Sequence, residues 1–343
     1  MRGKTKQFIW KLIFLLAIAG LAYYAFRDSS GQIAGELVKT PAGDLVVICL
    51  CALVYQCLDG VAITLLAKRY NPSFRFRHGI GCSYYTAFFK AITMGSGDLF
   101  ASMYYYTEHG IPPEKNYGLI TVFYVVQKIT ITLYCVVCLL CNYSYMLDNY
   151  RQYLFYFGFG ILLTVIVAAV LIFVCISERF HTFLLYLANK VIKKETWRQG
   201  LLELTEKLKA VREETVALIE DRKMLFGLLA FNALKLTAWY LVPVVLLRHS
   251  QVSGFPILSM IAATAALAGV MPAPAGIGST EFVYILLFTP LLGDVRAASS
   301  VLLYRFATFL FPSVLGGIYF LLTYVRKRAA KDITDGGLLD TRK

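Results

Sequence analysis

Apolar segments long enough to cross a lipid bilayer recur along almost the whole chain, and they constrain its fold more than any other feature. A transmembrane helix needs about 20 residues. Because lipid offers no hydrogen-bonding partner to the backbone and strand-length alternation is absent, we expect these segments to be helices. They lie near residues 7–26, 44–67, 79–103, 117–141, 153–177, 223–248, 257–292 and 297–325.

The composition agrees with this pattern. The 343 residues are 58% hydrophobic and only 16% charged, and the mean hydropathy is +0.62. These values are typical of an integral membrane protein. The basic start and the apolar run of residues 1–26 are also compatible with a signal peptide, but no convincing small-residue cleavage site follows, so we expect a retained first span. The sequence predicts an all-α polytopic membrane protein with no separate soluble domain.

Basic residues test the number of crossings. The net charge of +13 indicates positive cytoplasmic loops and contact with anionic lipid. Eight simple crossings would place the basic residues 178–222 outside the cell, against this rule. The conflict disappears if segments 79–103 and 257–292 are re-entrant hairpins that enter and return on the same side. We therefore expect about six spanning helices, with both termini cytoplasmic.

This topology contains an inverted repeat. Residues 1–141 and 153–325 each read as span, span, hairpin and span, in opposite orientations. Broken helices of such repeats meet near the bilayer midplane and form transport sites. Residues 1–343 then form one integral membrane domain.

Residues 178–222 form an insertion in the second repeat. Apolar residues recur between Leu201 and Leu218 at helical spacing, separated by charged residues. The pattern is typical of an amphipathic helix on the cytoplasmic membrane surface. A helix packed on neighbouring spans fits the pattern equally well.

The second hairpin is interrupted by the sequence GVMPAPAGIGSTEF, residues 269–282. Pro272 and Pro274 donate no backbone hydrogen bond, and Gly276 and Gly278 adopt turns that other residues resist, so the helix should end there. A helix that restarts near Ser279 would direct its N-terminal N–H groups into the gap, where an anion such as phosphate is favoured.

Charged residues inside apolar segments are the candidate site residues. A charge at the bilayer centre costs about 2.5 to 3.5 kcal/mol on insertion scales, so such residues should face a partner or a wet cavity. Glu281 could complement the helix dipole, bind a cationic headgroup or pair with Arg305, whose guanidinium could also bind phosphate. Asp98 could be a helix cap, and lysines can extend their ammonium groups to the interface from many depths. The candidates are Asp98, Lys128, Lys235, Glu281 and Arg305, with Lys90 in addition.

The eight cysteines do not indicate a metal site. Cys135, Cys138 and Cys141 are spaced three apart within one apolar helix without His or acidic partners. We interpret them as small buried hydrophobic residues, and we expect no metal and no cofactor.

Three sequence motifs carry a family resemblance. MPAPAGIGSTE and the following YRFATFLFPSVLGG resemble the signature of the lysylphosphatidylglycerol synthase transmembrane family, the flippase part of multiple peptide resistance factors. The stretch AITMGSGDLFASMYYYTEHGIP resembles an earlier block of that family, and the resemblance covers most of the chain. Ala275 stands where the family usually has glycine.

The resemblance implies a lipid flippase that moves aminoacylated phosphatidylglycerol between leaflets and contributes to resistance against cationic antimicrobial peptides. The implied partners are phosphatidylglycerol or its lysyl derivative, the anionic membrane, a separate synthase and a second copy of the chain. Two alternatives stay open: a phosphatidylglycerol lysyltransferase that uses lysyl-tRNA, and a transporter of another lipid or a small ion. We expect no catalytic residue, because no soluble synthase domain is recognisable. The predicted substrate-binding residues are Glu281, Arg305, Asp98, Lys128, Gly276, Gly278 and Ser279.

Overall fold

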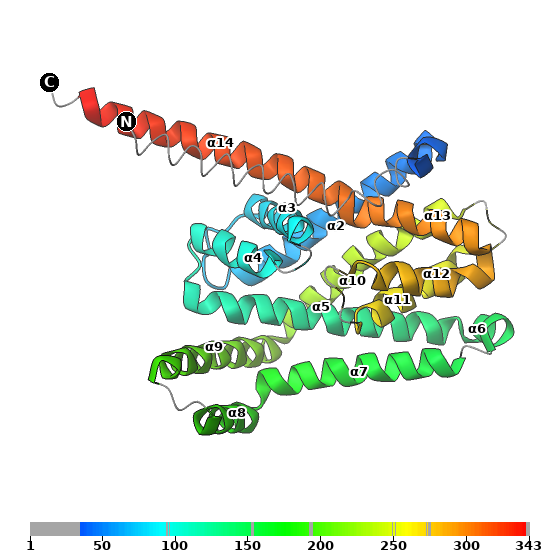
Figure 1. Ribbon diagram of the computed structural model, residues 1–343, viewed down its shortest axis with the longest axis horizontal. Coiled ribbons are helices and arrows are strands. Elements are labelled where there is room, and N and C mark those ends of the chain that lie inside the picture. Colours follow the sequence, from blue (N-terminus) through cyan, green and yellow to red (C-terminus); the bar gives the residue numbers. More distant parts are fainter. Residues whose placement is uncertain are drawn as a thin grey trace.

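The computed structural model describes residues 35–340, except 94, 96, 152–153, 192–194, 249, 251, 272, 274 and 275 (Figure 1). The described residues form helices and contain no strand, so the all-α fold class is confirmed for this part of the chain. In chain order the elements are α2 (Ala42–Ala67), α3 (Phe76–Ile92), α4 (Gly97–Glu108), α5 (Pro113–Cys141), α6 (Tyr143–Tyr150), α7 (Leu154–Ile176), α8 (Glu178–Val191), α9 (Glu195–Glu220), α10 (Arg222–Leu246), α11 (Gly254–Ala268), α12 (Ser279–Leu292), α13 (Asp294–Arg305), the π-helical segment η3 (Phe306–Leu310) and α14 (Phe311–Asp340).

Five helices among the described residues are long and apolar enough to cross a membrane. Each lies where the sequence predicts a span. The remaining predicted span, residues 7–26, lies outside the described residues. The five are Ala42–Ala67, Pro113–Cys141, Gly158–Ile176, Arg222–Leu246 and the continuous Asp294–Arg326.

The α3–α4 hairpin lies at the N-terminal end of α5. Its two outer ends meet, because the Asn71 side-chain amide donates to the His109 carbonyl at 2.7 Å. Near the start of α5, the Asn116 amide donates to the Thr107 hydroxyl of α4 at 2.9 Å. The chain therefore enters and leaves this hairpin at the same end of the molecule.

The α11–α12 hairpin lies at the opposite end of α5 (Figure 1). The Ser259 hydroxyl in α11 donates to the Cys138 carbonyl at 3.2 Å. The Tyr150 hydroxyl, from α6, donates to the Leu287 carbonyl of α12 at 3.1 Å. The two hairpins thus approach the molecule from opposite ends.

Helices α2 and α10 pack along each other in the centre and run antiparallel. At one end, Arg248 Nη2 lies 2.7 Å from Asp44 Oδ1. At the other, the Arg69 guanidinium reaches the Met224 sulfur at 3.7 Å. Helix α14 packs on α3, and α5 packs on α11, so each hairpin contacts the central pair and one long span.

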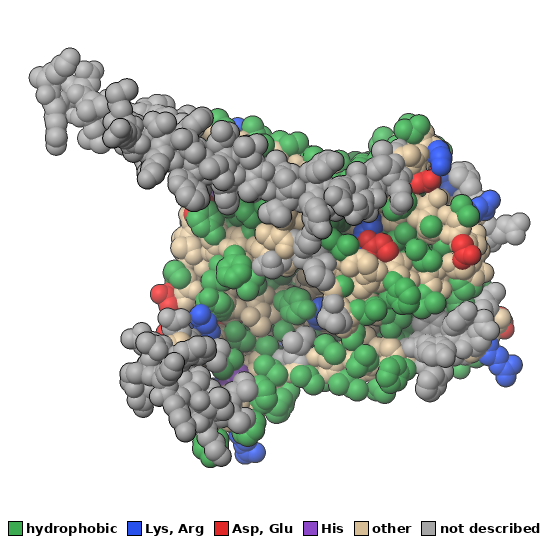
Figure 2. Space-filling model, in the orientation of Figure 1, with side chains coloured by type: hydrophobic (Ala, Val, Ile, Leu, Met, Phe, Trp, Pro, Cys, Tyr) green, Lys and Arg blue, Asp and Glu red, His purple; other side chains and the backbone are tan. Residues whose placement is uncertain are grey.

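The surface between the two ends is apolar. Figure 2 shows hydrophobic side chains over much of the middle of one face, whereas Lys and Arg side chains gather toward its edges. Large side chains such as Val137, Leu162, Phe173 and Leu322 are exposed. This distribution fits lipid contact, because lipid tails accept apolar side chains without cost.

Helix α9 packs on neighbouring spans, which is the second of the two arrangements compatible with its sequence. It contacts α5 and α7. Lys115 Nζ, near the start of α5, lies 3.2 Å from Glu213 Oε2. The Arg212 guanidinium donates to the Ile176 carbonyl at the end of α7 and lies 2.8 Å from Glu178 Oε2.

The three spaced cysteines do not share one environment. Cys135 and Cys138 are buried as predicted, but Cys141 is exposed, so the prediction is wrong for this residue. A helix turns about 100° per residue, which places Cys141 about 120° around the axis from Cys135.

Candidate functional site

The break in the second hairpin occurs where the sequence predicts it. Helix α11 ends at Ala268, and α12 begins at Ser279. Gly276 and Gly278 have φ angles of 69° and 85°, in the left-handed region that side chains with a Cβ resist. Pro272 and Pro274 lie outside the described residues, so their predicted role is not visible.

Glu281 and Arg305 form a two-bond ion pair beside this break. Arg305 Nε donates to Glu281 Oε1 at 2.7 Å, and Nη2 donates to Oε2 at 2.9 Å. Glu281 Oε2 also accepts from the Gly278 N–H at 2.8 Å. Glu281 therefore caps the start of α12 and pairs with Arg305 at the same time, which unites two of its predicted roles.

The Arg305 guanidinium makes further contacts besides its ion pair with Glu281. Nη2 also donates to the Gly276 carbonyl, and the guanidinium lies 5.7 Å from the centre of the Phe309 ring. Nη1 has no hydrogen-bond partner among the described residues, and the Arg305 side chain is 13% exposed. The π-helical turn that follows Arg305 is a local feature frequent at functional sites.

Lys128 contacts the other end of the same break. Its ammonium group donates to the Gly269 carbonyl at 3.1 Å. Gly269 follows the last residue of α11, so Lys128 satisfies a carbonyl at the negative end of that helix. The pair of bases at the two ends of one break was not apparent from their positions in the sequence.

Asp98 and Lys90 belong to the first hairpin. Asp98 lies in the first turn of α4, where Oδ1 accepts from the Leu99 N–H at 2.7 Å. Lys90 near the end of α3 is half-buried and makes no hydrogen bond or ion pair with another described residue. It interacts electrostatically with four charged groups, namely Asp98, Arg305, Asp59 and Lys235. Lys90 therefore lies within electrostatic range of charged residues from both halves of the chain.

Sequence reasoning missed one acid in this interior. Asp59 in α2 pairs with the fully buried Lys235 of α10, with Nζ 2.6 Å from Oδ1. Ser83 of α3 lies 2.6 Å from Asp59 Oδ2, and its hydroxyl also contacts the Gln56 side-chain oxygen. Asp59 could have been found from the sequence, because it is a charged residue inside a predicted span. The cost of placing a charge inside the bilayer, which singles out Lys235, applies equally to Asp59.

Aromatic rings enclose the Lys235 ammonium group. It lies 4.7 Å from the centre of the Phe123 ring and 5.5 Å from that of Tyr55. Tyr55 stacks on Trp239 with ring centres 3.9 Å apart. These rings stabilise a cation but also close it off from direct contact with a ligand.

The structure thus groups most of the predicted residues around the second break. Glu281, Arg305, Gly276 and Gly278 are in direct contact, and Ser279 donates to the Gly276 carbonyl at 3.3 Å. Lys128 lies at the far side of the break. Asp98 stands apart, in the first turn of α4. Their binding of a substrate stays a prediction.

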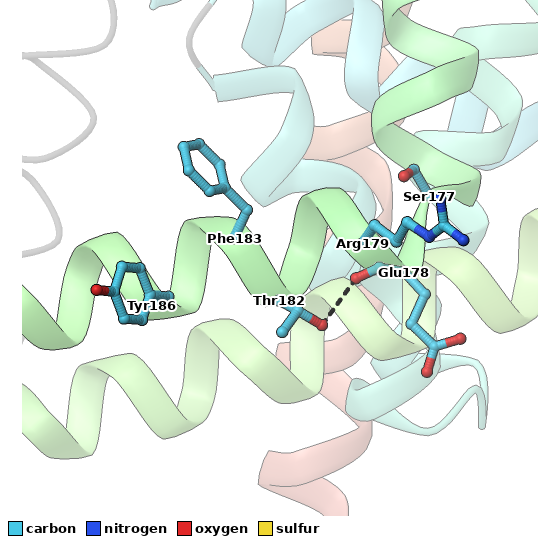
Figure 3. Close-up of a pocket in the computed structure, with 6 residues that line it drawn as sticks. All are labelled: Ser177, Glu178, Arg179, Thr182, Phe183 and Tyr186. Atoms are coloured by element: carbon cyan, nitrogen blue, oxygen red, sulfur yellow. Dashed lines mark hydrogen bonds between the residues drawn. The ribbon is translucent and has the colours of Figure 1, made fainter.

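A surface hollow along α8 lies apart from this group. It is shallow and open, and it is lined by Ser177 and by side chains of α8, where the Thr182 hydroxyl donates to the Glu178 carbonyl at 2.9 Å (Figure 3). No group of three or more His, Cys, Asp or Glu that could hold a metal ion occurs in the described part of the chain.

The long apolar helices and the two ion pairs Asp59–Lys235 and Glu281–Arg305 are those of a helical multi-pass membrane protein. Residues 8–316 match the family described as "Lysylphosphatidylglycerol synthase TM region", and the chain belongs to this family. The resemblance noted in the sequence is therefore confirmed. A comparison with curated proteins finds no match.

Proposed function

We propose that the chain moves an aminoacylated phosphatidylglycerol between the leaflets of a bacterial plasma membrane. The observation that carries the proposal is the geometry of Arg305. Its Nε and Nη2 are fixed by Glu281, while Nη1 has no partner among the described residues. A guanidinium held in this way is preorganised for a phosphate oxygen.

The neighbouring charges fit the two ends of a lysyl headgroup. Lys90, which has no ion pair with a described residue and interacts with Arg305, supplies a second positive charge for the phosphate. Asp98 supplies a carboxylate for an ammonium group. Glu281 is less suited to that role, because both of its oxygens already accept hydrogen bonds.

The packing of the helices supports an inverted repeat with two re-entrant hairpins. The hairpins lie at opposite ends of α5, α2 pairs with α10, and the α3–α14 contact has its counterpart in α11–α5. In such repeats, broken helices surround a central site that opens to each side in turn. Acyl tails would stay in the bilayer while the headgroup crosses.

The membrane orientation is part of the proposal. Residues 68–77, helix α9 and the start of α5 lie at one end of the molecule and carry many basic residues, so this end is assigned to the cytoplasm together with both termini. A cysteine at the exposed Lys209 should react with an impermeant maleimide only from the cytoplasmic side. A cysteine at the exposed Tyr143 should react only from outside, and the reverse result would overturn the orientation.

Reconstitution tests the function itself. The purified chain is placed in liposomes that contain fluorescent lysyl-phosphatidylglycerol or fluorescent phosphatidylglycerol, and a membrane-impermeant quencher measures leaflet exchange. We expect exchange of the lysyl lipid above the rate of protein-free liposomes. Equal rates with and without protein, for both lipids, would overturn the proposal. A positive result would support a role in resistance to cationic antimicrobial peptides, since outward lysyl lipid lowers the negative surface charge.

A lysyltransferase is the second candidate, and the word "synthase" in the family description favours it. The test is incubation of the purified chain with lysyl-tRNA and phosphatidylglycerol. We expect no lysyl lipid unless a separate synthase is added. Robust product from the chain alone would replace the flippase proposal with the enzyme. Whether the chain works as a dimer can be read from its mass in detergent.

A further inference from the structure

Side chains hold the corner between α7 and α8 in one geometry. The Ser177 hydroxyl accepts from the Phe180 N–H at 3.2 Å and so caps the start of α8. Nε2 of the buried His181 lies 2.6 Å from the Val174 carbonyl near the end of α7, and since a carbonyl only accepts, the imidazole donates. The direction in which α8 leaves α7 is therefore fixed.

The length of α7 sets the depth of this corner in the bilayer. The candidate span Gly158–Ile176 has 19 residues, which at 1.5 Å per residue is about 29 Å. The hydrocarbon core of a bilayer is about 30 Å thick, so the span ends where the hydrocarbon ends. Helix α8 begins directly after it, at Glu178, and therefore lies at the level of the lipid headgroups.

Helix α8 runs across the direction of α7. Figure 1 shows α7 lengthwise and α8 nearly end-on, so α8 lies along the membrane surface when α7 crosses the membrane. It also lies at the basic end of the molecule, because Arg212 of α9 donates to the Ile176 carbonyl and lies 2.8 Å from Glu178 Oε2. A helix in this position is interfacial.

The exposed apolar surface of α7 continues onto one side of α8. Phe173 of α7 is 57% exposed, and its ring centre lies 5.8 Å from that of Phe180. Because a helix turns about 100° per residue, Phe183 lies about 60° around α8 from Phe180, whereas Thr182 lies about 160° away. Figure 3 accordingly shows Phe183 and Thr182 on opposite sides of α8, with Phe183 on the side of α7. Phe183, which is 55% exposed, thus points toward the bilayer.

Arg179 and Tyr186 lie on the same stripe of α8, one turn before and one turn after Phe183. Tyr186 is 64% exposed, and tyrosine is enriched at the membrane–water interface. Arg179 is exposed and makes no ion pair with another described residue, and the adjacent Glu178 is already paired with Arg212. A guanidinium matches the geometry of a phosphate. The stripe therefore offers an apolar group to the acyl chains and a positive charge to the headgroup of one lipid.

We propose that α8 is an interfacial helix that binds an anionic phospholipid, with Phe183 among the acyl chains and Arg179 on the phosphate. This lipid site is separate from the break between α11 and α12, and it does not rest on the proposed flippase function. The membrane-surface position that the sequence suggests for residues 178–222 then belongs to α8, while α9 packs on neighbouring spans.

Photo-crosslinking tests which side of α8 faces lipid. A photoreactive benzoylphenylalanine is placed at residue 183 or, as the matched control, at residue 182 of the full chain. Each protein is reconstituted in liposomes with equal amounts of phosphatidylglycerol and phosphatidylcholine, and lipid adducts are identified by mass spectrometry. We expect lipid adducts from residue 183 and a loss of these adducts when the probe is at residue 182, which faces water.

The lipid composition of the adducts tests the role of Arg179. We expect phosphatidylglycerol adducts at residue 183 to exceed phosphatidylcholine adducts about fivefold, the factor that corresponds to about 1 kcal/mol from one basic residue near an anionic surface. The excess should fall at high salt and disappear in Arg179→Gln. Lys209→Gln is the control, because Lys209 is an exposed basic residue of α9, and it should keep the excess. Size-exclusion profiles check that each variant is folded.

Each contrary outcome overturns a stated part of the proposal. Adducts from residue 182 but not from residue 183, or from neither, overturn the placement of α8 at the membrane surface. Adducts to a second copy of the chain in place of lipid assign the stripe to a protein interface and also overturn it. Equal yields of the two lipids, or an excess that survives Arg179→Gln, overturn the anionic site. Crosslinking does not depend on leaflet exchange, so these results leave the flippase proposal to its own test.

Discussion

A Cβ atom at Gly60 would lie 2.7 Å from the backbone nitrogen of Ile80 and 2.8 Å from its Cα. Gly60 is in the C-terminal third of α2, and Ile80 is in the second turn of α3. Small residues allow helix backbones to approach this closely in membrane proteins. The position of the first hairpin against the central helix therefore depends on the missing side chain.

Gly60→Ala should consequently destabilise the protein. Two of the three nearest atoms belong to the Ile80 backbone and cannot rotate away, so we expect a loss of about 1 to 3 kcal/mol, the usual cost of overpacking. Thermal unfolding in detergent measures the effect. Gly227→Ala is the matched control, because nothing lies within 4 Å of the added atom; it should raise stability by roughly 0.5 to 1 kcal/mol. Equal melting temperatures for the two variants would contradict the close-packing argument.

The ion pair beside the second break gives a functional prediction. Glu281→Gln keeps the side-chain volume but removes the charge that fixes Arg305, and Arg305→Lys removes the guanidinium that makes two parallel bonds. Both variants should remain folded and inserted but lose headgroup-dependent lipid exchange. Liposome exchange assays alongside size-exclusion profiles measure the two properties separately.

The control for this pair lies elsewhere in the fold. Asp44→Asn breaks the ion pair with Arg248, where the distance is also 2.7 Å. It should lower stability only modestly, because the Arg248 side chain is 52% exposed and exposed ion pairs contribute about 0 to 1 kcal/mol, yet leave the exchange rate of folded protein unchanged. If Glu281→Gln exchanges both lipids at the wild-type rate, Glu281 is only a helix cap.

Much of this fold could be predicted from hydrophobic length and charge alone. Local rules about helix length, proline and glycine predict the spans and the break before Ser279. The placement of the basic loops indicates that segments 79–103 and 257–292 do not each cross the membrane once. The family signature lies in the same break. These features are visible in the sequence because each depends on neighbouring residues.

The partners of the charged residues could not be predicted in the same way. Lys128 binds the carbonyl of Gly269, which is 141 residues away, and Asp59 binds Lys235 at a separation of 176 residues. Such pairs depend on how the spans pack, and helical periodicity carries no information about that packing. The docking of α9 against α5 was undecided for the same reason, since one amphipathic pattern suits both lipid and protein.

The contact of α9 with α5 predicts a pH effect on stability. Burial raises the pKa of Glu214 above its ordinary value of 4.5, although Arg69 opposes the shift. The folded state therefore binds a proton more tightly than the unfolded state, and this group should make folding less favourable as the pH rises upward from about 4.5. Glu214→Gln should remove that part of the pH dependence.

Melting temperatures between pH 4 and pH 7 test whether stability falls as the pH rises. The wild type should lose stability relative to Glu214→Gln as the pH increases. The adjacent Glu213→Gln is the control, because the Glu213 side chain is 48% exposed and no such difference is expected. A wild type that gains stability relative to Glu214→Gln over this range would show that the pairing with Lys115, at 3.7 Å, outweighs burial.

Substitutions of the two half-buried lysines, Lys90 and Lys128, should have different effects, one on lipid binding and the other on the stability of the fold. Lys90 has no ion pair with a described residue, whereas Lys128 holds the Gly269 carbonyl at the end of α11. Lys90→Met should therefore raise the lipid concentration needed for half-maximal exchange, by roughly tenfold or more if one charged hydrogen bond of about 1.5 to 3 kcal/mol is lost, with little change in melting temperature. Lys128→Met should mainly lower the melting temperature, because an exposed helix end loses its partner.

Exchange rates across a series of lipid contents, combined with thermal unfolding of each variant, distinguish the two effects. If Lys90→Met leaves the concentration dependence unaltered and Lys128→Met shifts it, the phosphate contact belongs to the second break alone, and Lys128 takes the role assigned to Lys90.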